Sequence, residues 1–331
     1  MDVSIVIVNW NSAEYTRQCI ASIRENTKAT SHEIIVVDNA STDDSLVYLE
    51  TIEGIQLIRS QQNIGFARAN NVGVEASSGN ILLFLNPDTE LAGPAIDKMF
   101  EALQMSDCAA LGCKLLNTDR TLQTSCIQPF PTIWNQITDI EKLKLMFPHV
   151  RMWGIAPLFT EVREYPVPVE ALSGACIMIR SEVFQQVGQF STDYFMYAED
   201  IDLCYKIQQS GKKVGYIPDA TIIHFGGQST KKRSDTGFGD IATREAIFTF
   251  LRKFRGTAYA KIYRAALGIV SALRVALLKI FLLFTFNRDS REYLTFTARK
   301  WLKILRWSMG LENWTERLTP QKPHRIGESE S

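Results

Sequence analysis

The sequence predicts an α/β fold in which helices cover both faces of a mostly parallel sheet. Over residues 3–85, short apolar runs alternate with segments of helical spacing. Most positions in these runs are apolar, as expected for strands that are buried on both faces. Polar side chains follow the ends of these runs, at the edge where open parallel sheets bind ligands; they are Asn9, Asp38, Asn86 and Asp88.

The predicted elements follow one another in a regular order. The strands are expected at Val3–Val8, Glu33–Val37, Ile55–Arg59 and Ile81–Leu85. The helices between them are expected at Ala13–Asn26, Ser45–Glu50 and Gly65–Ala76. Beyond an irregular insertion over residues 117–170, the sequence predicts two more strands and a mobile loop rich in glycine, serine and basic residues: Ala171–Arg180, Val214–Ile217 and Gly226–Gly239.

Composition narrows the class of protein. The 331 residues are 46% hydrophobic, which is enough for a sizeable core. The six cysteines include no Cys-x-x-Cys pair and fit a reduced, cytosolic setting. An apolar strand starts directly after Met1-Asp2, so no secretory signal is expected. The first strand is not followed by Gly-x-Gly-x-x-Gly, and no Gly-x-x-x-x-Gly-Lys-Ser/Thr occurs, which argues against a dinucleotide-binding fold and a P-loop NTPase.

Charge is distributed unevenly along a chain whose formal net charge is zero. Residues 251–310 hold 13 Lys/Arg and 2 Asp/Glu, and the rest of the chain holds 23 Lys/Arg and 34 Asp/Glu. A basic C-terminal block on an acidic body predicts an anionic partner for that block.

The segment Phe195–Cys204 is the most informative part of the chain. It places Glu199, Asp200 and Asp202 within an otherwise apolar and aromatic stretch. A buried carboxylate needs a cation, hydrogen bonds or a catalytic use to offset the cost of burial. In one interpretation these acids cap the helix Asp202–Gln209 and interact with its dipole. In the other, they form a metal and general-base site with the strand-end Asp88 and the lone His224.

Six short motifs, taken together, resemble those of the family 2 glycosyltransferases with the GT-A fold. They occur in the family's order over residues 3–230: Val3–Asn11, Val36–Asp43, Asn63–Asn71, Leu85–Asp88, Ser173–Ala175 and Glu199-Asp200. The Asn-Pro-Asp and His-x-Gly-Gly-x-Ser variants are most similar to those of bacterial rhamnosyltransferases of cell-surface polysaccharide assembly. The resemblance implies a Rossmann-like, mostly parallel sheet flanked by helices and inverting transfer of a sugar from a nucleotide donor.

Several polar residues are expected to bind the nucleotide-sugar. Asp38 can accept from N3–H of a uracil or thymine ring, although an Asx-turn would also suit it. Gly65 permits close backbone approach, and the amides of Asn63 and Asn70 suit base and ribose edges. Lys231 is expected to close over the diphosphate, or else to lie in a solvated basic loop. The predicted donor-binding set is Asn9, Asp38, Asn63, Gly65, Asn70, Asn86 and Lys231.

The resemblance assigns a metal site and a base. Asp88 is the best candidate ligand for a hard divalent cation, either Mn²⁺ or Mg²⁺, with His224 as its partner or as a structural histidine. Asn86 replaces the first acid of the family's DxD turn. Asp200 is the expected catalytic base, and Glu199 is expected to position the acceptor. Asp202 is expected to cap the helix that follows.

The C-terminal block is expected to form two basic amphipathic helices. In Lys261–Phe286, seven polar or small residues fall on one arc of roughly 140° and the rest is apolar. Leu294–Met309 repeats the pattern. Arg274 and Lys279 interrupt the apolar run, so no stretch is expected to span a bilayer. The pattern predicts in-plane membrane anchors, with packing on the catalytic domain or on a second subunit as the alternative.

These observations predict a catalytic domain over residues 1–235, with a nucleotide-binding half (1–100) and an acceptor half (101–235). A membrane-associating helical region follows over 240–315, and a disordered tail over 316–331. The expected activity is transfer of a sugar, L-rhamnose from dTDP-L-rhamnose, to a lipid-linked saccharide at the cytoplasmic face of the membrane. Alternatives are a UDP-sugar-dependent galactofuranosyl or N-acetylhexosaminyl transferase and a non-catalytic sugar-nucleotide-binding scaffold. No nucleic-acid partner is expected, because the basic residues lie on lipid-like helices, and a homodimer is possible.

Overall fold

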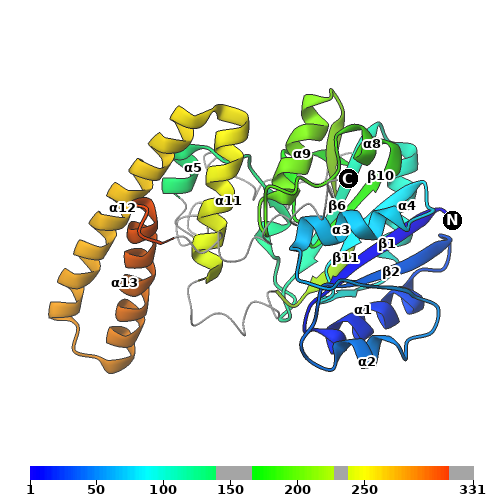
Figure 1. The fold of residues 1–331 in the computed structure, drawn as a ribbon, viewed down its shortest axis with the longest axis horizontal. Coiled ribbons are helices and arrows are strands. Elements are labelled where there is room, and N and C mark those ends of the chain that lie inside the picture. The colour runs from blue at the N-terminus through cyan, green and yellow to red at the C-terminus, as the bar shows by residue number, and fades with distance from the viewer. Residues whose placement is uncertain (139–165, 227–237, 313–331) are drawn as a thin grey trace, which may run out of the picture.

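The computed structural model describes residues 1–138, 166–226 and 238–312. An α/β part carries the N-terminus, and three long helices from the C-terminal part of the chain lie to one side of it (Figure 1). The predicted mobile loop 226–239, Lys231 and the tail 316–331 lie wholly or mostly outside the described residues. The predicted α/β class, with its mostly parallel sheet and C-terminal helices, is confirmed.

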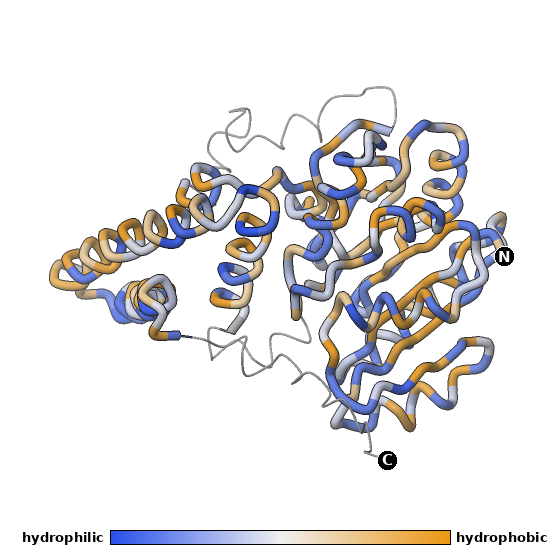
Figure 2. Tube along the Cα trace, turned by 45° about the horizontal axis from the view of Figure 1, so that its top comes forward, coloured by the Kyte–Doolittle hydropathy of each residue, from blue (hydrophilic) through white to orange (hydrophobic). Residues whose placement is uncertain are grey.

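The N-terminal half of the sheet is parallel. Its strands are β1 (Val3–Asn9), β2 (His32–Asp38), β3 (Gln56–Arg59) and β4 (Ile81–Leu85). They lie in the order β3-β2-β1-β4, and Asn9 pairs with Asp38 at the shared end of β1 and β2. Every residue of β1 and β4 is buried, as the apolar runs predict. Figure 2 shows these strands as apolar bands at the centre of the α/β part.

The second half of the sheet is mixed. Within the described residues the sheet has nine strands and continues β4-β10-β6-β11-β5, with β8 (Val167–Pro168) beside β11. β10 (Cys176–Arg180) is antiparallel to both β4 and β6 (Cys108–Leu116), and β5 (Thr89–Leu91) is antiparallel to β11 (Lys213–His224). A small separate sheet joins β7 (Ile127–Gln128) to β9 (Ala171–Leu172).

Helices cover the sheet and bury one large apolar core, beside a small second cluster of Val8, Val37 and Ala69. α1 (Ala13–Asn26) has the predicted bounds, and it buries Cys19, Ile20 and Ile23 against the sheet. The other helices of this part are α2 (Ser45–Leu49), α3 (Phe66–Glu75), α4 (Ala95–Met105), α5 (Ile133–Ile137), α8 (Ser181–Gln186) and α9 (Glu199–Gln209), with a short 3₁₀ turn, η1 (Thr124–Cys126).

Three predicted elements differ from those observed. The expected strand Ala171–Arg180 is divided into β9 and β10, because Ser173–Ala175 turns and Asn86 N–H donates to Ala175 O. The strand expected at Val214–Ile217 extends to His224. α9 begins at Glu199, three residues before the predicted start at Asp202, so the predicted cap is wrong. The N-cap is Ala198, in a left-handed conformation.

The C-terminal helices are α11 (Phe238–Arg255), α12 (Thr257–Phe284) and α13 (Arg288–Ser308). α11 packs on the α/β part, since its Phe250 stacks with Phe130 and contacts Tyr205. α12 and α13 form a hairpin that projects away from the sheet (Figure 1). By length and composition alone, α12 is long and apolar enough to cross a membrane, which corrects the expectation that Arg274 and Lys279 shorten the apolar segment too much.

Candidate functional site

A cavity of about 460 Å³ lies at the edge of the sheet where β1 and β4 end. Segments from both halves of the α/β part and from α11 form its walls. Of the residues predicted from the sequence, those that line it are Asn63, Gly65, Asn86, Asp88, Glu199, Asp200 and His224. The structure therefore brings together the expected base, the expected metal ligands and part of the expected donor-binding set.

Asp88 and His224 lie side by side in this cavity. Their Oδ1 and Nε2 atoms are 3.3 Å apart. β5 and β11 bring them together: His224 pairs with Thr89 across the two strands, and Phe225 N–H donates to Asp88 O. Asn86 Nδ2 is 3.4 Å from the same His224 nitrogen. A carboxylate, an imidazole and an amide thus converge on one point.

The amide of Gln123 fixes the orientation of this imidazole. Gln123 Nε2 donates to Asn117 Oδ1, so Gln123 Oε1 is the atom that lies 2.7 Å from His224 Nδ1. An amide oxygen can only accept, so Nδ1 carries a proton, and a neutral His224 presents the lone pair of Nε2 toward Asp88. Metal-ligating histidines are held in the same way by a second hydrogen bond.

The donor set fits a divalent cation that is only partly held by the protein. Asp88 and His224 would supply a carboxylate oxygen and an imidazole nitrogen. Asn86 directs its amide nitrogen toward His224, so its side chain would have to turn to add a neutral oxygen. Among the residues described, no group of three or more His, Cys, Asp and Glu side chains could hold a metal by itself. Proteins commonly bind Mg²⁺ through only one or two carboxylates, and the phosphates of the substrate complete the coordination. Mn²⁺ accepts the same oxygen ligands.

Asp200 occupies the second position of α9 and is partly exposed in the cavity. Its Oδ2 accepts from Gly174 N–H at 2.7 Å, and its Oδ1 accepts from Ile201 N–H at 2.8 Å. Burial raises the pKa of Asp200 above its ordinary value, and these two hydrogen bonds oppose that shift. Because Ala175 O accepts from Asn86 N–H, the turn that holds Asp200 also contacts the Asn86–Asp88 turn.

Glu199 is more deeply buried than Asp200, with 6% of its surface exposed. Within the described residues its Oε2 has no hydrogen-bond partner. Burial, followed by the charge of Asp200, raises the pKa of Glu199 to about 8. A protonated Glu199 can donate a hydrogen bond into the cavity, whereas Asp200 beside it can accept one.

A strained segment precedes these acids and contacts the N-terminal half of the protein. Tyr197 and Ala198 both have positive φ angles, 69° and 62°. Phe66 N–H donates to Phe195 O, and a Cβ on Gly65 would lie 2.5 Å from that oxygen. Only glycine fits at position 65, where φ is +83°. Gly65 was expected to let the backbone approach a ligand closely. In the structure, Gly65 lies close to the backbone of Phe195.

Asn9, Asp38 and Asn70 do not line the cavity, although they lie near it. Asn9 Nδ2 donates to Asp38 Oδ1 at 2.8 Å, and both side chains are buried. Asp38 also accepts from the hydroxyl and the backbone N–H of Ser41, so the predicted Asx-type turn is present. Asn70 Nδ2 donates to Phe66 O within its own helix.

Some cavity residues were not predicted as site residues. Trp10 and Asn39 directly follow the predicted Asn9 and Asp38, and they line the cavity where those residues do not. Thr243 and Ile247 come from α11 and lie one helical turn apart, a spacing that would place them on one face of a helix. The sequence gives no other sign that α11 reaches the site.

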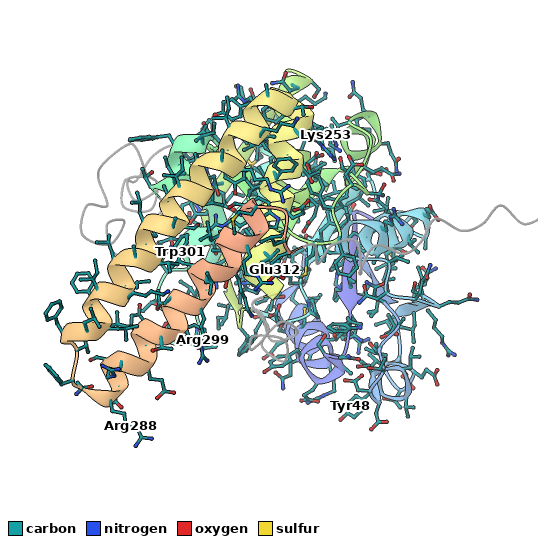
Figure 3. The ribbon with its side chains drawn as sticks, turned by 60° about the vertical axis from the view of Figure 1, so that its left-hand side comes forward. Tyr48, Lys253, Arg288, Arg299, Trp301 and Glu312 are labelled. Atoms are coloured by element: carbon teal, nitrogen blue, oxygen red, sulfur yellow. The ribbon has the colours of Figure 1, made fainter. Side chains whose placement is uncertain are left out.

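Asp202 belongs to a buried ionic cluster rather than to the helix cap. Its side chain is fully buried and accepts from Ser191 and Tyr194 hydroxyls at 2.5 and 3.0 Å. Lys206 of α9 lies 3.1 Å from one oxygen, and Lys253 of α11 lies 2.8 Å from the other. Lys253 lies near the C-terminal end of α11, and Figure 3 shows it beside the α/β part. This cluster joins α11 to the helix that carries Glu199 and Asp200.

The chain is similar to known glycosyltransferases in both sequence and structure. The model of Glycosyl transferase family 2 matches residues 4–188, and that of Glycosyl transferase family group 2 matches residues 145–314. The chain is 26% identical over 227 residues to the low-salt glycan biosynthesis hexosyltransferase Agl10 of Haloferax volcanii, covering 67% of each chain. It is 25% identical over 240 residues to the N-acetylglucosaminyl-diphospho-decaprenol L-rhamnosyltransferase of Mycobacterium tuberculosis, covering 68% of this chain and 76% of that one.

The fold is similar to that of the mannosyltransferase PcManGT from Pyrobaculum calidifontis, solved in complex with GDP-Man and Mn²⁺. The TM-score is 0.58 at 16% identity, and the match covers 95% of this chain and 87% of that one. This likeness confirms the predicted GT-A fold. Since the first family model spans more than half of the 331 residues, the chain belongs to the family 2 glycosyltransferases.

Proposed function

We propose that this protein is a metal-dependent, inverting glycosyltransferase that transfers a sugar from a nucleoside diphosphate donor to a lipid-linked saccharide. The observation that carries the proposal is the position of Asp200 in the same cavity as the Asp88–His224 pair. One carboxylate to take a proton and one site to hold a diphosphate are sufficient for a single displacement. Glycosidases instead flank the scissile bond with two acids.

In the proposed reaction, Asp200 takes the proton of the acceptor hydroxyl. The hydroxyl oxygen bonds to the anomeric carbon, the bond from that carbon to the diphosphate oxygen breaks, and the nucleoside diphosphate leaves with both electrons. The two backbone N–H groups on Asp200 hold its carboxylate in place, and the raised pKa makes it a stronger base than an exposed aspartate. Glu199, protonated because it is buried, would donate to an acceptor or donor hydroxyl.

Asp88 and His224, with the help of Asn86, would hold the divalent ion. That ion would neutralise the charge that develops on the leaving diphosphate. Asn63, Gly65 and Asn39 line the same cavity and would contact the nucleoside. Asp38 and Asn9 would support that wall from behind, because their hydrogen bonds tie the ends of β1 and β2 together. Lys231 is retained as a candidate diphosphate ligand.

The donor is proposed to be dTDP-L-rhamnose. Support comes from the Asn-Pro-Asp and His-x-Gly-Gly-x-Ser motifs and from the similarity to the mycobacterial rhamnosyltransferase. That relative's name also describes its acceptor as a sugar on a diphospho-decaprenol. A lipid-linked saccharide for this chain would be reached from the cytoplasmic face of the membrane, on which the basic C-terminal helices would hold the enzyme.

A donor panel tests the proposal. The purified full-length protein would be titrated with dTDP-, UDP- and GDP-sugars, with and without Mn²⁺, and then assayed for transfer to a saccharide on a lipid diphosphate. We expect metal-dependent binding and release of dTDP from dTDP-L-rhamnose. Preference for a UDP-sugar would replace the donor but keep the reaction. Binding without any transfer would favour the scaffold alternative.

A further inference from the structure

The hairpin of α12 and α13 exposes an apolar surface. On α12, six large apolar side chains at spacings of three, four or seven residues are each more than half exposed: Ile262, Ile269, Leu273, Leu277, Ile280 and Phe284. We call these six residues the outer face. Its free end continues into the turn of the hairpin, where Leu283 and Phe286 are 74% and 90% exposed. Figure 2 shows α12 as a largely apolar helix that projects from the rest of the molecule.

The opposite side of α12 holds the polar and small residues that the helical wheel places on one arc. Ser271 is fully buried, and Gly268 packs so closely on α13 that a Cβ there would lie 2.6 Å from Ser308 Oγ. Arg264 donates to Trp307 O at 2.6 Å, and Arg274 lies over the ring of Trp301. Figure 3 shows Trp301 between the two helices. Apart from the exposed Lys261 and Lys279 at its edge, the polar arc thus faces the protein, and the outer face is left uncovered.

We propose that the outer face and the hairpin turn insert into the surface of an anionic lipid bilayer. An apolar surface of this length is costly to leave in water. The charge around it selects lipid over a second copy of the chain. Lys279 lies one helical turn before Leu283, and Arg288 is the first residue of α13 after the hairpin turn. Lys279 and Arg288 are both exposed. Residues 257–308, which form the hairpin, hold 10 Lys/Arg and 2 Asp/Glu. Two such hairpins would repel each other, whereas anionic lipid would attract each of them.

The hairpin lies in the plane of the interface rather than crossing the membrane. α12 meets the length and composition required of a spanning helix, but α13 is packed along it. α13 carries Arg288, Asp289, Arg291 and Glu292 near the turn and Arg299 and Lys300 further along. Taking α12 through the bilayer would either separate the two helices or carry those charges into the hydrocarbon. A partly inserted hairpin keeps the contacts on the inner side of α12 and buries the outer face.

The C-terminal helices would connect the bilayer to the reaction cavity. This connection, unlike the lipid binding, rests on the proposed function. α11 lines the cavity through Thr243 and Ile247. The same helix contacts α13, because Trp307 Nε1 donates to Glu245 Oε2. One group of helices therefore touches both the site and the proposed lipid surface, as a transferase with a lipid-linked acceptor requires. Vesicle binding itself does not depend on the donor or on catalysis.

Flotation of the full-length protein with lipid vesicles tests the inference. Vesicles of phosphatidylglycerol with phosphatidylcholine would be compared with phosphatidylcholine alone, at low and high salt. We expect the protein to float with the anionic vesicles, more weakly at high salt. Replacing Leu273 and Leu277 by serine should lower the apparent affinity about tenfold or more. The control replaces Val47 and Met105 by serine, since both are exposed apolar residues of the α/β part, and it should bind as the wild type does.

A second variant separates charge from apolar contact. Lys279→Glu with Arg288→Glu should weaken binding to anionic vesicles and leave binding to neutral ones unchanged. All variants should still bind the donor nucleotide, which shows that they are folded. If the wild type floats with vesicles but transfers no sugar, only the proposed function is refuted. The inference is overturned if the wild type ignores anionic vesicles, or if the leucine variant floats like the wild type. The inference is also overturned if the wild type is a dimer that the leucine variant dissociates. Failure of alkaline carbonate to extract the protein from vesicles would overturn it too, because that result indicates a helix that spans the membrane.

Discussion

His224 Nε2 lies 3.3 Å from Asp88 Oδ1, with the other imidazole nitrogen fixed by Gln123. Strand pairing brings the two residues together, because His224 ends β11 opposite Thr89, the residue that follows Asp88. Two electron-rich atoms so placed are stabilised by a cation between them or by a proton on the imidazole. The relationship therefore makes a direct prediction about metal binding.

We expect Asp88→Ala and His224→Ala each to weaken both Mn²⁺ binding and donor binding, by tenfold or more. Isothermal titration with Mn²⁺ in the presence of the nucleoside diphosphate would measure the first, and titration with donor the second. Asp107→Ala is a suitable control, because Asp107 pairs with Lys213 on the surface and does not line the cavity. Full activity of the wild type in excess EDTA would refute the metal assignment for both residues.

Gln123→Met should weaken metal binding less than loss of a ligand does. Without the Oε1 acceptor, the Nδ1 proton is no longer favoured and the imidazole can turn or change tautomer. We expect roughly a tenfold loss in Mn²⁺ affinity, within the range seen for groups that orient ligands. Isothermal titration of the variant and the wild type with Mn²⁺ at the same pH would show it. Equal affinities would mean that Gln123 does not orient His224.

Much of the site could be predicted from the sequence because strand ends in a parallel sheet share one edge. This placed Asn86 and Asp88 at the edge where the cavity lies. Asp200, on α9, was assigned from the acidic segment and the family resemblance instead. The same reasoning could not tell which of two neighbouring residues at a strand end reaches the cavity. Asn9 and Asp38 are hydrogen-bonded to each other, whereas Trp10 and Asn39 line the cavity. Neighbouring residues at a strand end point in different directions, and only the packed structure decides between them.

The C-terminal half shows a different limit. The helical wheel identified the polar arc of α12 correctly, but periodicity gives no sign of which arc faces the protein. The contacts of Arg264 and Arg274 with two tryptophans turn that arc inward. Similarly, Asp202 was expected to cap a helix because acids are common there, whereas Lys253, far away in the sequence, makes it part of a buried cluster.

Asp200→Asn should retain donor binding and lose about 10²–10⁴-fold in turnover, as is typical when a general base is removed. The amide can still interact with Gly174 N–H through its oxygen, so the local structure should hold. Release of nucleoside diphosphate in the presence of acceptor measures turnover, and titration measures donor binding. Near-normal turnover would remove Asp200 from the mechanism.

Glu199→Gln should stabilise the protein at alkaline pH. The folded-state pKa of about 8 exceeds the ordinary value of 4.5, so between these values the folded protein keeps a proton that the unfolded chain releases. Stability is therefore lost as the pH rises through this window, and glutamine removes the loss. We expect the variant's advantage in urea unfolding to be about 1 kcal/mol or more larger at pH 8.5 than at pH 4.5. An advantage that does not grow with pH would contradict the buried, protonated Glu199.

Lys253→Ala tests how firmly α11 is held on α9. Asp202 would keep Lys206, Tyr194 and Ser191 but lose a 2.8 Å ion pair in a buried position. Loss of a charged partner from a buried hydrogen-bonded group costs about 1–3 kcal/mol. The matched control is Lys300→Ala, which removes a partly exposed pair between α13 and Asp240 and should cost less than about 1 kcal/mol. Urea unfolding of both variants measures the difference, and turnover shows whether Asp200 is displaced. Equal costs for the two variants would mean that the buried cluster contributes no more than a surface ion pair.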